Sequence, residues 1–182
     1  MREIEVKAQV AGLGDIRAAL KSQGVELSEP VTQKDVVWGL PGVTGDNTEP
    51  WLRVRSETEG DLTRHLLTLK RSVTSQLDNI EYESEVGDPL QVANIIEDLG
   101  FELYNSLTKI RQKAVIGEIE VCLDSVEGLG DFIEAEKLTE DNTDHQQVMD
   151  ELWILLERFG ASRADEVTDG YDTLMNRKLG KE

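Results

Sequence analysis

The first ten residues read Met-Arg-Glu-Ile-Glu-Val-Lys-Ala-Gln-Val (residues 1–10), and charged and apolar side chains alternate along them. Glu3, Glu5 and Lys7 occupy odd positions, whereas positions 4, 6, 8 and 10 are apolar. This alternation predicts a β-strand that carries both carboxylates and the ammonium on one face. Neighbouring side chains on that face lie roughly 6.6–6.8 Å apart, so the two glutamates could bracket a hard cation while Lys7 meets an anion. A solvated outer face above an apolar core is the alternative interpretation.

The same alternation recurs along most of the chain and predicts seven further strands, over residues 31–38, 51–56, 62–71, 79–86, 101–115, 118–124 and 131–137. Apolar residues at helical spacing predict helices over about 15–23, 89–99 and 144–159, and a short helix within 163–179. The expected N-caps are Asp15, Asp88 and, for the last of the three longer helices, Thr143 or Asp144. This order indicates the α+β class, with two similar blocks that hint at an internal repeat and helices from about residue 142 onward.

Length and composition limit the classes of protein and partner. A chain of 182 residues suits one domain, so we expect residues 1–182 to form a single unit. A net charge of −18 disfavours nucleic acid and anionic membranes as partners, and no apolar run is long enough for a transmembrane helix. The one cysteine, Cys122, predicts a reduced, cytoplasmic protein. With only His65 and His145 present, a zinc site or a histidine-based triad is poorly supported.

Every predicted strand has one apolar and one charged face, and periodicity leaves two arrangements open. The charged faces could point to water, or the sheet could close into a barrel with a charged lumen and helices over its apolar exterior. The predicted charged faces carry the bases Lys7, Arg53, Arg55, Lys70, Lys109, Arg111 and Lys113. They also carry the acids Glu3, Glu5, Glu81, Glu83, Glu85, Glu118, Glu120, Asp124, Glu134 and Glu136. Acids and bases gathered in one cavity would suit a metal-bound polyphosphate.

Several motifs in order resemble those of the CYTH superfamily, the triphosphate tunnel metalloenzymes, and most closely its class IV adenylyl cyclase branch. Glu3-Ile-Glu-Val-Lys7 matches the Glu-x-Glu-x-Lys signature. The other matching segments are residues 33–35, 53–55, 68–70, 81–85, 109–111, 123–130 and 132–136, so the resemblance covers about residues 1–175. Two departures are Val37, where relatives often have an aromatic residue, and Asp169, where they often have a basic one.

The resemblance implies an α+β fold in which a closed eight-stranded antiparallel β-barrel, or tunnel, has a charged lumen and helices packed outside. It implies dependence on Mg²⁺ or Mn²⁺, with the metal side formed by Glu3, Glu5, Asp124, Glu134 and Glu136. The triphosphate side would be Lys7, Arg53, Arg55, Lys70, Lys109 and Arg111. The implied catalytic residues are Glu5, Lys7, Lys109 and Glu134. A second ion could be held, or the bases oriented, by Glu81, Glu83 and Glu85.

Three functions follow from the resemblance. The first is an adenylyl cyclase that converts ATP to cyclic AMP and pyrophosphate. The second is a hydrolase of inorganic tripolyphosphate or thiamine triphosphate, and the third is a polyphosphate or nucleotide sensor without turnover. The same charged residues would serve all three, so the sequence leaves the choice open. The apolar stripe of the predicted helix 144–159 could pack on the barrel or on a second subunit, and a homodimer is one expectation.

Overall fold

Eight strands close into an antiparallel barrel in the computed structural model, which describes residues 2–42, 49–140 and 143–181. They are β1 (Arg2–Val10), β2 (Val31–Gly39), β3 (Trp51–Glu59), β4 (Leu62–Ser75), β5 (Asp78–Val86), β6 (Glu102–Ile116), β7 (Ile119–Val126) and β8 (Gly130–Thr139). Their order around the barrel is β1-β5-β4-β3-β2-β6-β7-β8. The predicted closed barrel and its α+β class are therefore confirmed.

Strand β1 closes the barrel because it pairs with a neighbour on each side. It pairs with β8 along its whole length, from Arg2 opposite Thr139 to Val10 opposite Asp131. Its pairing with β5 covers only residues 2–4 of β1. The opening stretch of sequence is thus the seam of the barrel, and its alternation sends one row of side chains inward and the other outward.

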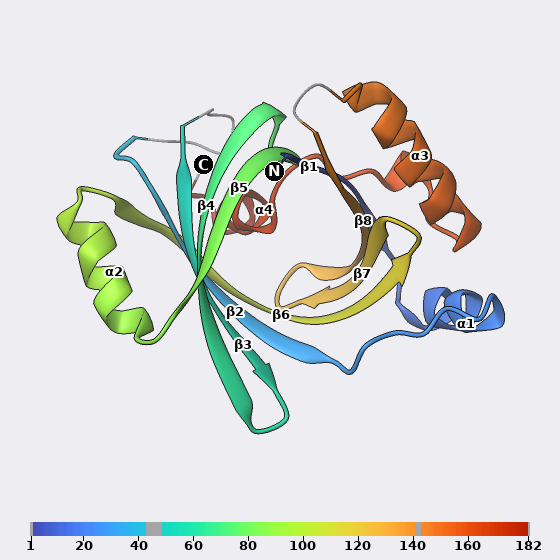
Figure 1. The fold of residues 1–182 in the computed structure, drawn as a ribbon, viewed down its shortest axis with the longest axis horizontal. Coiled ribbons are helices and arrows are strands. Elements are labelled where there is room, and N and C mark those ends of the chain that lie inside the picture. Colours follow the sequence, from blue (N-terminus) through green and yellow to red (C-terminus); the bar gives the residue numbers. More distant parts are fainter. Residues whose placement is uncertain (1, 43–48, 141–142, 182) are drawn as a thin grey trace.

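Four α-helices and one short 3₁₀ helix complete the described structure: α1 (Gly14–Ser22), α2 (Pro89–Asp98), α3 (His145–Arg158), η1 (Arg163–Asp165) and α4 (Tyr171–Lys178). In Figure 1, α2 lies outside the barrel on one side, and α1 and α3 lie outside it on the other. Helix α4 lies within the outline of the strands in the same view. Residues 141–142, where the helical tail was expected to begin, lie outside the described residues.

Two of the three predicted helix caps are confirmed. Asp88 accepts hydrogen bonds from the backbone N–H groups of Leu90 and Gln91, and Asp144 caps α3 in the same way. The prediction for α1 was wrong: the helix begins at Gly14 after Leu13, which offers no side-chain cap. Asp15 instead lies in the first turn, where a carboxylate is also favoured by the helix dipole.

The largest hydrophobic core lies outside the barrel wall, between β1, β7 and β8 and the helices α1 and α3. Ile4 and Val6 of β1 meet Leu152, Trp153 and other residues of the α3 stripe there. These side chains are almost completely buried, and each contributes roughly 1.5–3 kcal/mol of hydrophobic free energy. The stripe of α3 therefore packs on the barrel of its own chain.

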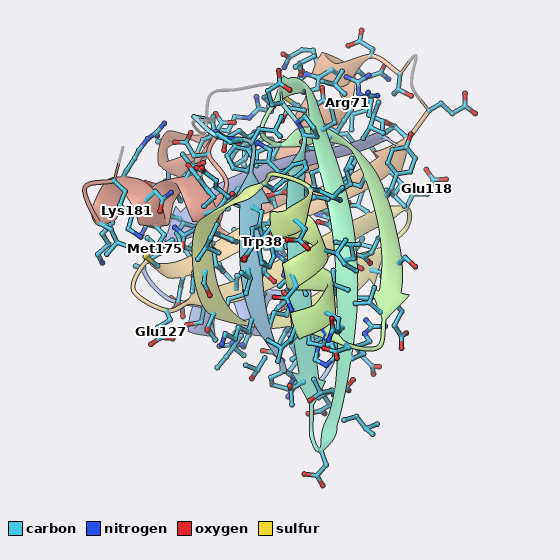
Figure 2. The ribbon with its side chains drawn as sticks, turned by 90° about the vertical axis from the view of Figure 1, so that its left-hand side faces the viewer. Trp38, Arg71, Glu118, Glu127, Met175 and Lys181 are labelled. Atoms are coloured by element: carbon cyan, nitrogen blue, oxygen red, sulfur yellow. The ribbon has the colours of Figure 1, made fainter. Side chains whose placement is uncertain are left out.

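A second core lies beneath α2, where Trp38 of β2 and Val54 of β3 contact Ile96. In Figure 2, Trp38 is labelled next to α2. The apolar side chains of these strands thus point outward under a helix, which leaves the interior of the barrel to the charged rows. No helix among the described residues has the length and apolar character needed to cross a bilayer.

Candidate active site

A cavity of about 540 Å³ runs inside the barrel. All seven bases predicted to share a face line it: Lys7, Arg53, Arg55, Lys70, Lys109, Arg111 and Lys113. Lys7, Lys109 and Arg111 are 2%, 3% and 6% exposed, which a surface face would not allow. The charged rows of the strands therefore point into the lumen.

The predicted acids divide into those that line the cavity and those that do not. Six line it: Glu3, Glu5, Glu81, Glu83, Glu134 and Glu136. Glu118 was wrongly placed on the inner face, because it lies in the turn before β7 with 85% of its side chain exposed. Glu85 is exposed near the end of β5. Glu120 and Asp124 lie on β7 and are not among the described residues that line the cavity.

Three carboxylates converge at one corner of the cavity. Glu5 of β1 lies directly opposite Glu136 of β8 in the strand register, and Glu3 is two residues away on the same face. One ligand oxygen from each lies within 4.8 Å of the others. Carboxylate oxygens are ligands that Mg²⁺ and Mn²⁺ prefer, so this partly buried corner fits a divalent cation.

The electrostatics of this acidic corner support the same conclusion. Burial and the neighbouring Glu134 raise the pKa of Glu5 to about 7, although Lys7 lies 3.0 Å away. Burial also raises the pKa of Glu3, and burial together with Glu3 raises the pKa of Glu136 well above its usual range. The acids outnumber the positive charges available to them, and a bound cation would relieve this imbalance.

Glu134 is also buried, but bases surround it. Its carboxylate lies 3.2 Å from the Lys7 ammonium and accepts a hydrogen bond from the Arg111 guanidinium. Burial alone would raise the pKa of Glu134, but Arg111, Lys7 and Lys109 together hold it well below its usual range. Glu134 therefore stays ionised and fixes the positions of two of the predicted triphosphate ligands.

Asp124 has the same role on the neighbouring strand, β7. Its carboxylate is completely buried and accepts hydrogen bonds from Lys109 Nζ at 2.9 Å and Arg111 Nε at 2.7 Å. Asp124 and Glu134, both predicted on the metal side, are thus paired with bases in the described structure. The carboxylates that converge without enough bases are Glu3, Glu5 and Glu136.

The opposite wall of the cavity carries a second set of bases. Arg55 of β3 makes two hydrogen bonds of 2.7 Å to Asp35 of β2, a planar fork that fixes its guanidinium. Lys70 forms an ion pair with Glu81, which places Glu81 as an orienting partner. In the sequence, Asp35 stands out only as part of the family motif at residues 33–35. Its neighbours Lys34 and Val36 do not show which face of the strand the Asp35 side chain occupies.

Arg53 and Glu83 meet through Thr68. Arg53 donates to the Thr68 hydroxyl at 3.2 Å, and that hydroxyl donates to Glu83 at 2.8 Å. Arg53 Nε is buried and has no hydrogen-bond partner among the described residues. This guanidinium therefore retains a donor for an anion that enters the cavity.

The C-terminal segment supplies lining residues that strand alternation could not reveal. Gly170, Tyr171, Asp172 and Thr173, at the start of α4, line the cavity. Trp51 lines it as well and packs against Tyr104, with ring centroids 4.5 Å apart. The signal for Tyr171 was the Tyr-Asp-Thr-Leu-Met stretch, which by itself predicted only a short helix.

Comparison with known proteins identifies the class to which this fold and site belong. The family model for the CYTH domain matches residues 1–171. A charged tunnel lined by converging acids and bases is the site of a metal-dependent enzyme that acts on triphosphates. The chain belongs to the CYTH family.

Particular relatives resemble the whole chain. The Methanocaldococcus jannaschii protein named "Putative adenylate cyclase MJ0240" is 27% identical over 175 residues, which is 94% of this chain and 97% of that protein. The PH1819 protein of Pyrococcus horikoshii has a similar fold, with a TM-score of 0.84 and 23% identity over 97% of this chain and 99% of its own. "Putative adenylyl cyclase HpAC1" from Hippeastrum, described as having a dominant triphosphatase activity, aligns with a TM-score of 0.60 and 14% identity over 98% of this chain and 95% of its own.

Proposed function

We propose that this protein is an adenylyl cyclase that converts ATP to cyclic AMP and pyrophosphate. The observation that carries the proposal is the arrangement of charges in the lumen, where Glu3, Glu5 and Glu136 converge and seven bases line the same cavity. ATP bound to a divalent cation presents a metal to the acids and phosphate oxygens to the bases. The name of the Methanocaldococcus jannaschii relative supports the choice of ATP.

Glu3, Glu5 and Glu136 would hold Mg²⁺ or Mn²⁺. The bound cation would lower the pKa of an attacking hydroxyl and neutralise charge on the phosphates. Glu134 and Asp124 remain candidate metal ligands, and their present contacts support a role in orienting Lys7, Lys109 and Arg111. Glu81 would orient Lys70, and Glu83 would orient Arg53, unless these acids hold a second cation. Glu85 is exposed near the end of β5, so neither role is favoured for it.

The bases would bind the three phosphates as a chain along the lumen. Arg55 and Arg111 are already held by carboxylates, so little side-chain entropy is lost when phosphate oxygens replace solvent around them. Arg53 and Lys70 would bind from the other wall. Lys7 and Lys109 would face the phosphates that depart as pyrophosphate, where preorganised positive charge stabilises the transition state.

In the cyclase reaction, the ribose 3′ oxygen forms a bond to the α-phosphorus, and the bond from that phosphorus to the bridging oxygen of the β-phosphate breaks. The hydroxyl proton passes to a carboxylate, and pyrophosphate leaves with the bond electrons. None of the described residues that line the cavity is a histidine. The acceptor would therefore be a lining carboxylate and not an imidazole.

A triphosphatase is the second candidate, and the activity in the description of the Hippeastrum neighbour favours it. Water would attack the terminal phosphorus of tripolyphosphate or thiamine triphosphate, and the same acids and bases would serve. A sensor that binds without turnover is the third candidate. The converging acids disfavour a sensor, since binding alone does not require them.

One incubation series separates the three candidates. ATP, tripolyphosphate and thiamine triphosphate are each incubated with Mg²⁺ or Mn²⁺ from pH 6 to 9, and cyclic AMP, pyrophosphate and phosphate are measured together. We expect cyclic AMP and pyrophosphate in equal amounts from ATP. Phosphate from tripolyphosphate or thiamine triphosphate without cyclic AMP would identify a triphosphatase, and tight binding without product would identify a sensor.

Matched variants link the activity to the cavity. Glu5→Gln removes an acid from the acidic corner and should lower turnover at least about a hundredfold. Glu118→Gln makes the same chemical change at an exposed turn and should leave turnover unchanged. Equal activity of the two variants would contradict the assignment of the site.

Two further expectations concern the setting of the protein. Cys122 is buried and forms no disulfide, which fits the expected cytoplasmic setting. A homodimer remains a prediction, which sedimentation analysis would test.

A further inference from the structure

Tyr171, the first residue of α4, lies against two of the lysines in the cavity. The Lys7 ammonium is 4.3 Å from the centre of its ring, and the Lys109 ammonium is 4.8 Å from the same point. The ring is only 8% exposed, and Phe132 meets it edge-on at 4.9 Å between centroids. One aromatic side chain thus contacts ammonium groups from β1 and β6, which are not neighbours in the barrel.

This contact addresses an electrostatic difficulty. Lys7 and Lys109 are both buried and carry like charges, and Arg111 adds a third positive charge nearby. Glu134 pairs with Lys7, and Asp124 pairs with Lys109. Each of these carboxylates pairs with one of the two lysines, whereas Tyr171 contacts both ammonium groups. An aromatic ring face attracts cations within about 6 Å, and the attraction increases when water is excluded. The Tyr171 ring can therefore hold the two ammonium groups side by side without adding a negative charge that would compete with a phosphate.

The segment that carries Tyr171 is joined to the barrel by specific hydrogen bonds. The backbone N–H of Val167 donates to the carbonyl of Lys7 at 2.9 Å, and Asn105 of β6 donates to the carbonyl of Asp172 at 3.1 Å. On the other side, the backbone N–H of Gly170 donates to the Gln76 side chain at 2.7 Å. These hydrogen bonds hold the C-terminal segment against the barrel, so the position of the Tyr171 ring depends on them.

We propose that Tyr171 is a positioning residue, whose ring holds the ammonium groups of Lys7 and Lys109 in place for a triphosphate. The proposal rests on the proposed function for its ligand and adds that affinity for the triphosphate depends on the docked C-terminal helix. The competing interpretation is that Tyr171 only fills space, because it also packs with Leu107, Val126 and Phe132 in a small apolar cluster.

The test uses inorganic tripolyphosphate with Mg²⁺ as the probe, in titration calorimetry on the 182-residue chain. Tyr171→Phe keeps the ring and should bind within about threefold of the wild type. Tyr171→Leu and Tyr171→Met keep an apolar side chain without a ring face, and each should weaken binding about tenfold. The two non-aromatic variants provide two chances of a folded protein, and thermal unfolding establishes which of them is folded.

Leu174→Ala is the matched control, because Leu174 packs on the same cluster from α4 but has no ring face to offer the lysines. This variant should lower the melting temperature and leave tripolyphosphate affinity within about threefold. The inference would be overturned if Tyr171→Phe lost as much affinity as the non-aromatic variants, or if the latter bound like the wild type. Failure of the wild type to bind tripolyphosphate or ATP would instead contradict the proposed function.

Discussion

Glu5 and Glu134 are both buried in one cavity, yet their surroundings move their proton affinities in opposite directions. Glu5 lies with Glu3 and Glu136, so burial and like charges raise its pKa to about 7. Glu134 would also be raised by burial, but Arg111 and its neighbours hold its pKa well below the usual range. At neutral pH the first group can exchange a proton or accept a cation, while the second remains a fixed negative charge.

This difference predicts an unusual pH dependence of stability. Without metal, folded Glu5 binds its proton more tightly than it does in the unfolded chain, so the free energy of unfolding should fall as pH rises from about 4.5 to 7. The loss from Glu5 alone could reach about 3 kcal/mol. Urea unfolding in EDTA at several pH values measures it, and Glu5→Gln should flatten the dependence.

Three other carboxyl groups have raised pKa values and should likewise make the free energy of unfolding fall as pH rises: Glu3, Glu136 and Asp172. Three have lowered pKa values and should change the free energy of unfolding only at more acidic pH: Glu134, Asp124 and Asp35. Adding Mg²⁺ should raise stability more at pH 8 than at pH 5, because carboxylates must lose their protons to bind a cation. A metal-free protein that became more stable from pH 5 to 8 would contradict this account of Glu5.

Sequence alternation predicted which residues share a face of each strand at most positions, because side chains alternate between the two faces. It left open which face points inward, and the resemblance to the CYTH superfamily implied that the charged face does. It could not predict partners across the lumen. The family resemblance placed Asp124 and Glu134 on the metal side, and in the structure each contacts bases contributed by other strands. Such pairings depend on the register and the curvature of a closed barrel, which no local pattern contains.

At the scale of single elements, helix α2 covers apolar side chains on the outer face of the barrel. Asp88 caps it by accepting from two backbone N–H groups, and Ile96 packs beneath it on the strand core. Asp88→Ala should therefore lower the free energy of unfolding by about 1 kcal/mol. Because α2 contributes no residue to the cavity lining, turnover of the proposed substrate should not change.

Asp98→Ala is the matched control for this helix. Asp98 ends α2 and is exposed, and a carboxylate at a helix C-terminus gains nothing from the dipole. The change should leave stability unchanged or raise it slightly. If Asp88→Ala were no more destabilising than Asp98→Ala, the capping contact would be unimportant to the fold.

Elements with a repeating pattern were predicted from sequence, as was a short helix near the C-terminus, but the contacts of that helix with the barrel were not. Strand alternation and the α3 stripe each repeat over several residues, so they survive small errors of boundary. The prediction that Asp15 caps α1 was wrong because an acid in the first turn and an acid at the N-cap both follow from the preference for negative charge near a helix N-terminus. Helix α4 contacts the lysines of the cavity through Tyr171. Lys7 and Lys109 lie more than 60 residues from Tyr171 in sequence, so no local pattern predicts this contact.

At the scale of the whole molecule, the charge of the cavity differs from the charge of the chain. Eight bases and nine acids line the cavity, so nearly all of the net charge of −18 lies elsewhere. An approaching triphosphate first meets a repulsive exterior and only then the bases inside. Sequence composition predicted that nucleic acid would be repelled, but only the closed barrel explains how an anion can still be bound.

This arrangement predicts an inverted salt effect. The association rate of ATP should rise when KCl increases from 10 to 150 mM, because the screening length falls from about 30 Å to about 8 Å and weakens the exterior repulsion. Stopped-flow fluorescence can follow binding through Trp51, which lines the cavity. An association rate that falls with added salt would indicate an attractive exterior and would contradict this description.

The most direct test of the central claim is a crystal structure of the protein with Mn²⁺ and a non-hydrolysable ATP analogue. The account predicts an anomalous Mn²⁺ peak inside the barrel beside Glu3, Glu5 and Glu136, with the phosphate oxygens against Arg53, Arg55, Lys70 and their neighbours. Mn²⁺ and the analogue bound only on the exterior, with the lumen holding neither at millimolar concentrations, would contradict it.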